Sequence, residues 1–223
     1  VDALVAAKVN LEAEDETGAT ALGLAVRSGK HHATRHLLKA GALPVGGPQA
    51  KVHPLHETVT PEMGEMLIAA GADIDVRDRA GCTPLHHQPR AGRVGMVEFC
   101  LAHGADIEAL DHRGRTALFF AGSKGEAQGV FRKLLAAGAN PQVRDAEMNT
   151  WCHLAASRCA HPKVLEWVYE QTKDQWFLKN KAGETPWDLI TARGFQALSL
   201  RIKAEQSKKE SVAGNERRPE FNI

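Results

Sequence analysis

Histidine and cysteine are the residue types of this sequence whose side chains could bind a metal or act as a nucleophile. The chain has 11 His and four Cys among its 223 residues. His32 and His36 are four residues apart, a spacing that would place two metal ligands on one face of a helix. No Cys, Asp or Glu accompanies them at helical spacing. We therefore expect solvated histidines there, no metal site and no cofactor.

Nucleophilic catalysis is no better supported by the sequence. Cys152 and His153 are neighbours, and on one helix their side chains would point about 100° apart, which is a poor arrangement for a nucleophile and its base. No G-x-S-x-G, H-E-x-x-H or phosphate-binding loop occurs. The cysteines show no C-x-x-C spacing, so reduced thiols in an intracellular compartment, cytoplasmic or nuclear, are expected. These observations predict a protein that is not an enzyme.

Composition narrows the class further. Hydrophobic residues make up 43% of the chain and charged residues 25%, and the net charge is +1. That balance argues against nucleic-acid binding by bulk charge, although a local basic patch can exist on such a chain. No apolar run approaches the roughly 18–20 residues of a membrane span.

An internal repeat is the strongest pattern in the sequence. Gly-Ala pairs that close an apolar run stand at Gly41, Gly71, Gly104 and Gly138, at spacings of 30, 33 and 34 residues. A second marker lies 12 residues after each pair, at His53, Thr83, Thr116 and Thr150. Because two separate markers keep one period, the chain is predicted to be an array of similar structural units.

Each repeat carries its own start and stop signals. In the third repeat, Asp78 and Gly81 predict a tight turn, Thr83 is a helix N-cap, and Pro84 suits the first helical position. A short helix and a second helix follow, and the Gly of Gly-Ala ends the second helix with a left-handed C-cap. Every repeat is thus predicted to be a helix pair joined to the next by an extended turn.

The run Thr83-Pro84-Leu85-His86, the Gly-Ala pairs and the period of about 33 residues resemble the ankyrin repeat. The resemblance covers roughly residues 1–202. It implies an all-α solenoid of helix–turn–helix units joined by β-turn or hairpin loops. It also implies that His56, His86 and His153 bridge backbone groups of adjacent repeats. The expected core leucines are Leu22, Leu37, Leu38, Leu55, Leu67, Leu85, Leu101, Leu118, Leu134, Leu135, Leu154 and Leu189.

The repeat markers predict the following organisation. A partial repeat at 1–13 precedes repeats one to five at about 14–46, 47–76, 77–109, 110–143 and 144–178, a capping repeat at 179–202, and a charged tail at 203–223. The chain begins inside a repeat, so it is either a piece of a longer protein or a protein whose first repeat is degenerate, and the missing Met favours the former. A capped array of this kind is expected to be a monomeric module. The tail is expected to be a helix end followed by a segment with little structure.

Repeat two departs from the pattern, because it is three residues short. The deletion falls in its first helix, where Leu55-His56-Glu57-Thr58-Val59 runs straight into Thr60-Pro61. About one helical turn is missing. Two interpretations stay open: a tolerated deletion, or a notch in the concave surface that admits a side chain of a partner.

Ankyrin domains usually bind partners through the turn tips and the concave face of the first helices. The positions that the repeat leaves free are rich in Lys and Arg, which predicts a locally basic surface for an acidic peptide or acidic protein face. Trp and Arg are also enriched in interface hot spots. The predicted binding residues are Arg79, Arg90, His112, Arg113, Arg115, Lys124, Met148, Trp151, Arg158 and Lys181.

The favoured prediction is a protein–protein interaction module that acts as scaffold, adaptor or inhibitor. An alternative is the targeting arm of a larger multidomain enzyme or regulator, whose local activity would still be binding. Nucleic-acid or phospholipid binding through the basic stripe is less favoured, because one Tyr and 5% aromatic residues offer few stacking platforms for bases.

Overall fold

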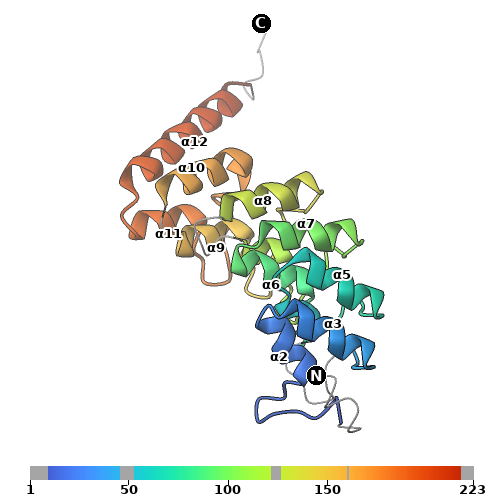
Figure 1. Ribbon diagram of the computed structural model, residues 1–223. Coiled ribbons are helices and arrows are strands. Elements are labelled where there is room, and N and C mark those ends of the chain that lie inside the picture. The colour runs from blue at the N-terminus through green and yellow to red at the C-terminus, as the bar shows by residue number, and fades with distance from the viewer. Residues whose placement is uncertain (1–9, 46–52, 122–126, 160, 217–223) are drawn as a thin grey trace, which may run out of the picture. The chain divides into compact units, whose positions relative to one another are not determined.

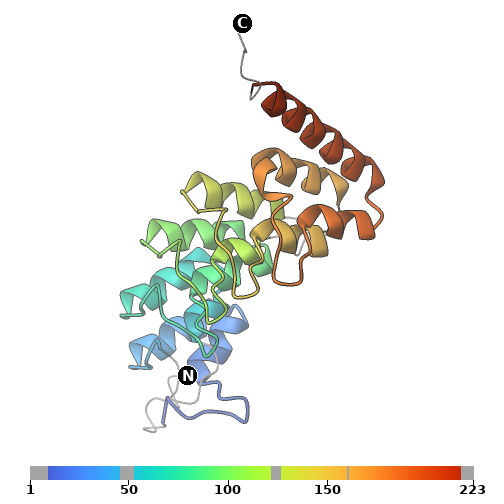
Figure 2. The same cartoon turned by 180° about the vertical axis from the view of Figure 1, so that it is seen from behind.

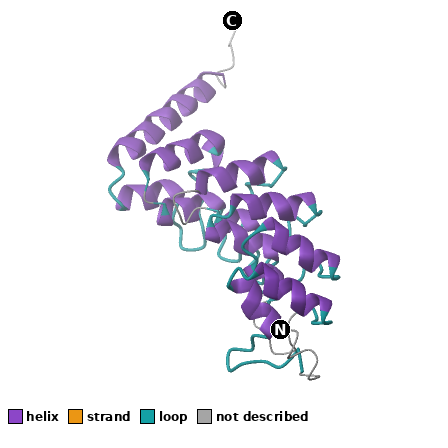
Figure 3. Ribbon diagram, in the orientation of Figure 1, coloured by secondary structure: helices purple, strands orange, loops and turns teal. Residues whose placement is uncertain are grey.

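The computed structural model describes residues 10–45, 53–121, 127–159 and 161–216. Within these ranges the backbone forms helices joined by loops and contains no named strand (Figure 3). Contacts divide the chain into two compact units, residues 1–146 and 147–223. We call them the N-terminal unit and the C-terminal unit and describe each by itself. The predicted all-α fold is confirmed.

The N-terminal unit consists of two layers of helices, which can be followed from both sides in Figures 1 and 2. The first-helix layer holds α2 (Ala21–Arg27), α4 (Pro54–Glu57), α6 (Pro84–Ala91) and the 3₁₀-helix η1 (Ala117–Phe120). The second-helix layer holds α3 (His31–Lys39), α5 (Pro61–Ala69), α7 (Val94–Ala102) and α8 (Ala127–Ala136). Neighbouring helices of one layer contact each other, and α2 and α6 also contact the second helices α3 and α7 that follow them.

The predicted start and stop signals form the helix ends. The Thr20 hydroxyl accepts a hydrogen bond from the Gly23 N–H at 3.2 Å, and α4, α5 and α6 have Pro in the first turn. The glycines of the Gly-Ala pairs have φ between 78° and 95°, in the left-handed region that favours glycine. The repeat markers therefore lie at the starts of the first helices and at the ends of the second helices of this unit.

Buried histidines bridge adjacent repeats, as predicted. Thr83 donates from its N–H to His86 Nδ1 at 3.0 Å, so that nitrogen is an acceptor and Nε2 carries the proton. His86 Nε2 then donates to the Arg115 carbonyl at 2.9 Å. His56 Nε2 lies 2.9 Å from the Cys82 carbonyl in the same way.

Repeat four lacks this bridge. Phe119 stands where repeats two, three and five have the bridging histidine. The Thr116 hydroxyl is buried and finds no hydrogen-bond partner in the described part of the chain. The first helix is here the short 3₁₀-helix η1. Loss of one imidazole thus removes the partner of a buried hydroxyl and the donor to the following repeat.

The C-terminal unit contains α9 (Trp151–Arg158), α10 (Pro162–Gln171), the 3₁₀-helix η2 (Lys173–Gln175), α11 (Pro186–Ala192) and α12 (Gln196–Glu216). Its core includes the fully buried Leu165, Trp176, Ile190 and Ile202. His153 Nε2 lies 3.2 Å from the Glu184 carbonyl, so the third predicted histidine bridge is also present.

Helix α12 corrects the prediction for residues 203–223. The segment expected to have little structure is helical as far as Glu216, and residues 217–223 lie outside the described range. The Tyr169 hydroxyl donates to Glu205 at 2.9 Å, and Lys209 pairs with Asp174 at 2.9 Å. Arg201 pairs with Glu170 on α10 and with Glu205 on its own helix. These contacts, together with the buried Ile202, hold α12 beyond the predicted boundary.

Most of the predicted core leucines are buried. Leu22, Leu37, Leu55, Leu67, Leu85, Leu118 and Leu134 are at most 7% exposed. The remaining predicted ones are partly exposed, namely Leu38, Leu101, Leu135, Leu154 and Leu189. A search of the described helices for a stretch both long and apolar enough to cross a membrane found none.

Candidate functional site

The turns between repeats are shaped by aspartates. Asp78 Oδ1 accepts hydrogen bonds from the N–H groups of Ala80 and Cys82 at 2.8 and 2.9 Å. Asp111 Oδ1 accepts from Arg113 and Arg115 in the same way, at 2.8 and 2.9 Å. Each carboxylate thus stabilises its turn by accepting hydrogen bonds from backbone N–H groups of the same turn. The side chains between the Asp and the Gly are therefore directed outward.

Three of the predicted residues lie on these turn tips in the N-terminal unit. Arg79, His112 and Arg113 are exposed. The N–H of His112 donates to the Ala80 carbonyl at 2.9 Å, so the tips of repeats three and four are adjacent. The structure thus brings together the basic tip residues that the sequence predicted.

Arg115 does not belong to this exposed set. Its side chain is 16% exposed, and Nε and Nη2 donate to Asp111 Oδ2 at 2.8 and 2.6 Å. The guanidinium also lies over the Phe120 ring, 4.6 Å from its centre. Arg115 therefore holds its own turn and ring together, and the expectation that it serves a partner is replaced by this internal role.

Trp151 was predicted as an apolar anchor for a partner, and this is wrong, because it is 2% exposed. It is the first residue of α9, the position that Pro84 occupies in α6 and Pro186 in α11, and both prolines are buried as well. The position belongs to the core of the repeat whichever residue fills it. Met148, three residues earlier, is 39% exposed and has a φ of 63°.

The other predicted residues of the C-terminal unit lie around one hollow. Arg158 and Lys181 are exposed and line a pocket of about 520 Å³ together with Glu147 and Glu184. The two cations face two carboxylates, so the charges of these four side chains cancel. Another predicted residue, Lys124, lies outside the described residues.

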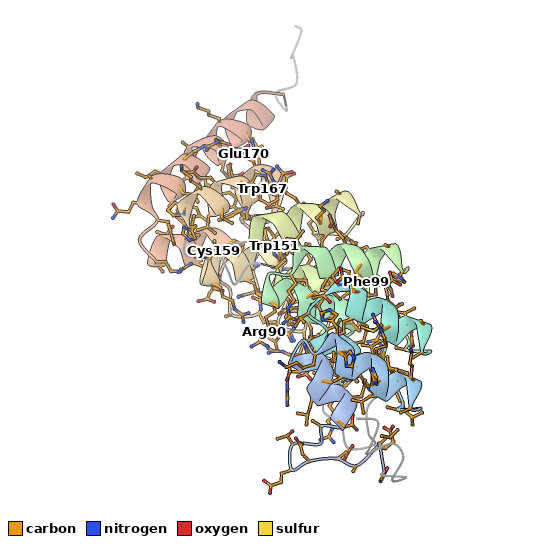
Figure 4. All side chains as sticks on the ribbon, viewed as in Figure 1. Arg90, Phe99, Trp151, Cys159, Trp167 and Glu170 are labelled. Carbon is orange, nitrogen blue, oxygen red and sulfur yellow. The ribbon has the colours of Figure 1, made fainter. Side chains whose placement is uncertain are left out.

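A second hollow lies in the N-terminal unit, at the shortened helix of repeat two. Helix α4 has four residues, whereas α2 has seven and α6 has eight. A pocket of about 580 Å³, which we call the notch pocket, is lined by Arg27, His56, Glu57, His87, Arg90, Ala91 and Arg93. Figure 4 shows Arg90 on the first-helix side of this unit and Phe99 on the second-helix side.

Only Arg90 of the notch pocket was among the predicted binding residues. Arg27 is the last residue of α2, and Arg93 is the N-cap residue of α7. The signal that could have identified them is the three-residue deficit of repeat two, because a missing turn exposes the residues that flank it. Predicting this pocket from the sequence requires that the deletion and the neighbouring arginines be considered together.

His56, Asp78 and His87 form a cluster beside this pocket, with ligand-type atoms within 4.8 Å of one another. His87 Nε2 is hydrogen-bonded to Asp78 Oδ2 at 2.8 Å, and His56 Nε2 to the Cys82 carbonyl at 2.9 Å. A cation would have to replace these contacts next to arginines that line the same pocket. The cluster offers metal-type ligands, but its geometry serves the turn and the histidine bridge.

Burial sets the protonation of these groups. Burial lowers the pKa of His56 to about 4, so its imidazole is neutral at neutral pH. Burial would raise the pKa of Asp78, but hydrogen bonds from His87, Cys82 and Ala80 outweigh it and hold the pKa below its usual value. The same effect of burial raises the pKa of Cys82 to about 11 and of Cys152 to about 12. Both cysteines therefore carry protonated thiols at neutral pH, which are poor nucleophiles.

Residues 55–145 match the family model described as ankyrin repeats in three copies. The match spans the C-terminal part of the N-terminal unit, including the turn tips and most of the notch pocket. A search of curated proteins found no match to the chain.

Proposed function

We propose, on the premise that this chain contains ankyrin repeats, that it is a non-enzymatic module that binds an acidic segment of a partner protein. Ankyrin repeats mediate protein–protein interactions in general. The binding surface that we propose is the row of turn tips in the N-terminal unit. The module would then act as a scaffold, adaptor or inhibitor, depending on what is joined to it and to its partner.

The observation that carries the proposal is the placement of Arg79, His112 and Arg113. All three are exposed, and the hydrogen bond from His112 N–H to the Ala80 carbonyl sets adjacent tips side by side. The chain as a whole carries a net charge of only +1. Cations gathered on rigid turns favour a ligand with several carboxylates, and such a field also raises the association rate.

Three further features belong to the same proposal. The four free cysteines are buried, which suits a reducing intracellular compartment. The raised thiol pKa values of Cys82 and Cys152 support a role without nucleophilic catalysis. We also propose that the module is a monomer, because the apolar faces of a repeat are buried against its neighbours in the array.

The test is binding of a fluorescent Asp/Glu-rich peptide, measured by anisotropy at low and moderate salt. The double variant Arg79→Glu/Arg113→Glu should weaken binding by at least about tenfold and flatten its salt dependence. Arg35→Glu is the matched control, because Arg35 is an exposed arginine on α3 in the second-helix layer. Equal affinity of the double variant and the control would refute the turn-tip surface.

A further inference from the structure

The notch pocket exists because repeat two is short. Helix α4 contacts both α2 and α6 but ends after four residues, at Glu57. Each helical residue adds about 1.5 Å, so its neighbours extend beyond it by roughly 5 Å. The resulting hollow of about 580 Å³ is within the size range of small-ligand sites. The short first helix of repeat two thus leaves a pocket of ligand size in the first-helix layer.

The charges around this hollow are unbalanced. Arg27, Arg90 and Arg93 line it, and Glu57 is the only carboxylate among the described residues that line it, whereas Asp78 is hydrogen-bonded to the lining residue His87 without being part of the lining. Glu57 is engaged with Arg27 at 3.7 Å, and the Arg27 side chain is still 48% exposed. The three arginines and Glu57 together carry a net charge of +2. That charge matches a dianion better than a single carboxylate.

Two of the arginines differ in a way that suits binding. Arg93 is fixed, because its Nη1 donates to the Thr58 carbonyl at 3.1 Å and to Gln88 Oε1 at 3.4 Å. Arg90 is exposed and has no ion pair or hydrogen bond with any described residue. One guanidinium is therefore held in place, and the other keeps its donors free for a ligand. Planar guanidinium groups bind phosphate oxygens through paired hydrogen bonds.

We propose that the notch pocket binds the phosphate group of a phosphorylated serine or threonine in the partner protein. A phosphorylated hydroxyl carries a charge of about −1.5 to −2 at neutral pH, which the lining residues complement. The assignment of a protein as the source of the phosphate rests on the proposed function. The site is distinct from the turn tips, because its arginines lie on α2, on α6 and at the start of α7.

The experiment uses the full chain and small probes of defined charge. O-phosphoserine, inorganic phosphate, serine and acetate are titrated while the arginine Nε–H resonances are followed by NMR. Phosphoserine and phosphate should shift the Arg90 and Arg93 signals saturably, and serine and acetate should leave them nearly unchanged. A phosphoserine peptide should bind at least about tenfold more tightly than its unphosphorylated form, as expected for charge-assisted pairs. Equal binding of acetate, or no saturation with phosphate, overturns the proposal.

Variants separate the pocket from general charge. Arg90→Glu should abolish the response to phosphoserine, Arg90→Lys should weaken it severalfold, and Arg35→Glu should leave it intact. Insertion of three alanines after Glu57 would restore the missing helical turn and should also remove binding, with helix content retained by circular dichroism. Unchanged phosphoserine affinity in Arg90→Glu would contradict the site even if the insertion variant misfolds.

The outcomes also distinguish this proposal from the turn-tip surface. If phosphoserine binds and the acidic peptide does not depend on Arg79 and Arg113, the turn-tip proposal fails and the pocket stands. If the acidic peptide depends on the tips but phosphoserine does not bind, the pocket proposal fails alone. If free phosphate binds but phosphorylation of a peptide does not increase its affinity, the pocket binds a free anion. That outcome would overturn the proposal that the phosphate belongs to a partner protein.

Discussion

Repeats three and four share the aspartate turn and the N-cap threonine but differ at the position of the bridging histidine. Both have an aspartate-tied turn and a buried threonine before the first helix, but His86 in repeat three corresponds to Phe119 in repeat four. With the imidazole present, the Thr83 hydroxyl is bonded at 2.9 Å and the first helix is an α-helix of eight residues. With phenylalanine, the Thr116 hydroxyl has no partner in the described chain and the helix is a 3₁₀-helix of four.

The difference shows what one side chain contributes to hydrogen bonding when it is both a donor and an acceptor. Imidazole accepts on one nitrogen and donates on the other, so it satisfies the turn behind it and the carbonyl ahead of it. Phenylalanine matches the burial of that histidine but has no polar atoms. The apolar packing of the core is kept with phenylalanine, but the hydrogen bonds of the imidazole are lost. The Thr116 hydroxyl is then buried away from water without a protein partner in the described chain.

Removal of the imidazole from repeat three should have the largest effect. His86→Ala leaves the Arg115 carbonyl and the Thr83 N–H unpaired and opens a cavity, at a cost of about 4 kcal/mol in the free energy of unfolding. Urea unfolding followed by circular dichroism measures this. A loss no larger than that of an exposed control such as Arg35→Ala would show that the bridge contributes little.

Acid should weaken the histidine-bridged repeats in a defined range. The pKa of His56 is about 4 in the fold, against the ordinary value of 6.5 for a solvated histidine, and burial also lowers the pKa of His86. Between pH 6.5 and 4 the unfolded chain binds more protons, so the free energy of unfolding should fall as pH falls. His56 alone accounts for up to about 3 kcal/mol of this loss.

The control for the acid effect is His56→Gln, whose amide can donate to the same Cys82 carbonyl without titrating. Its stability should vary less with pH across that range than that of the unaltered chain. Parallel pH profiles for the two proteins would mean that His56 does not carry the dependence.

Matched threonine variants test the comparison directly. Thr83→Val breaks the bond to His86 and should lower the free energy of unfolding by about 1–2 kcal/mol. Thr116→Val removes a hydroxyl without a partner in the described chain and should be neutral or stabilising by up to about 1 kcal/mol. The melting temperature should therefore fall for Thr83→Val and stay the same or rise for Thr116→Val. Equal destabilisation would mean that the Thr116 hydroxyl is satisfied in solution, for example by water.

The smallest expected effect is a coupling. Phe119→His places an acceptor within reach of Thr116, as in repeat three. A double-mutant cycle of Phe119→His with Thr116→Val should give a coupling of about 0.5–1 kcal/mol. If the effects of the two changes on the free energy of unfolding simply add, Thr116 does not interact with the introduced imidazole.

The fold could be predicted from the sequence because its signals are local and repeated. Gly-Ala pairs and N-cap threonines act within a few residues, and the buried histidines recur in repeats two, three and five, each bridging to a carbonyl 26 to 31 residues away. The candidate site was harder, because exposure depends on packing. Trp151 looked like an anchor but fills a core position, and Arg115 looked free but is held by Asp111. Helix α12 continues because of contacts with α10 and Asp174, which no local pattern in residues 203–216 reveals.

The buried cysteines have a practical consequence. Cys82 and Cys100 lie in the N-terminal unit, and Cys152 and Cys159 in the C-terminal unit, all four as buried free thiols. A thiol reagent can modify them only after the surrounding repeat opens. Each unit therefore contains two natural cysteine probes of local opening. The rate at which each cysteine is labelled, measured by mass spectrometry of its peptide, gives the opening rate of the repeat around it.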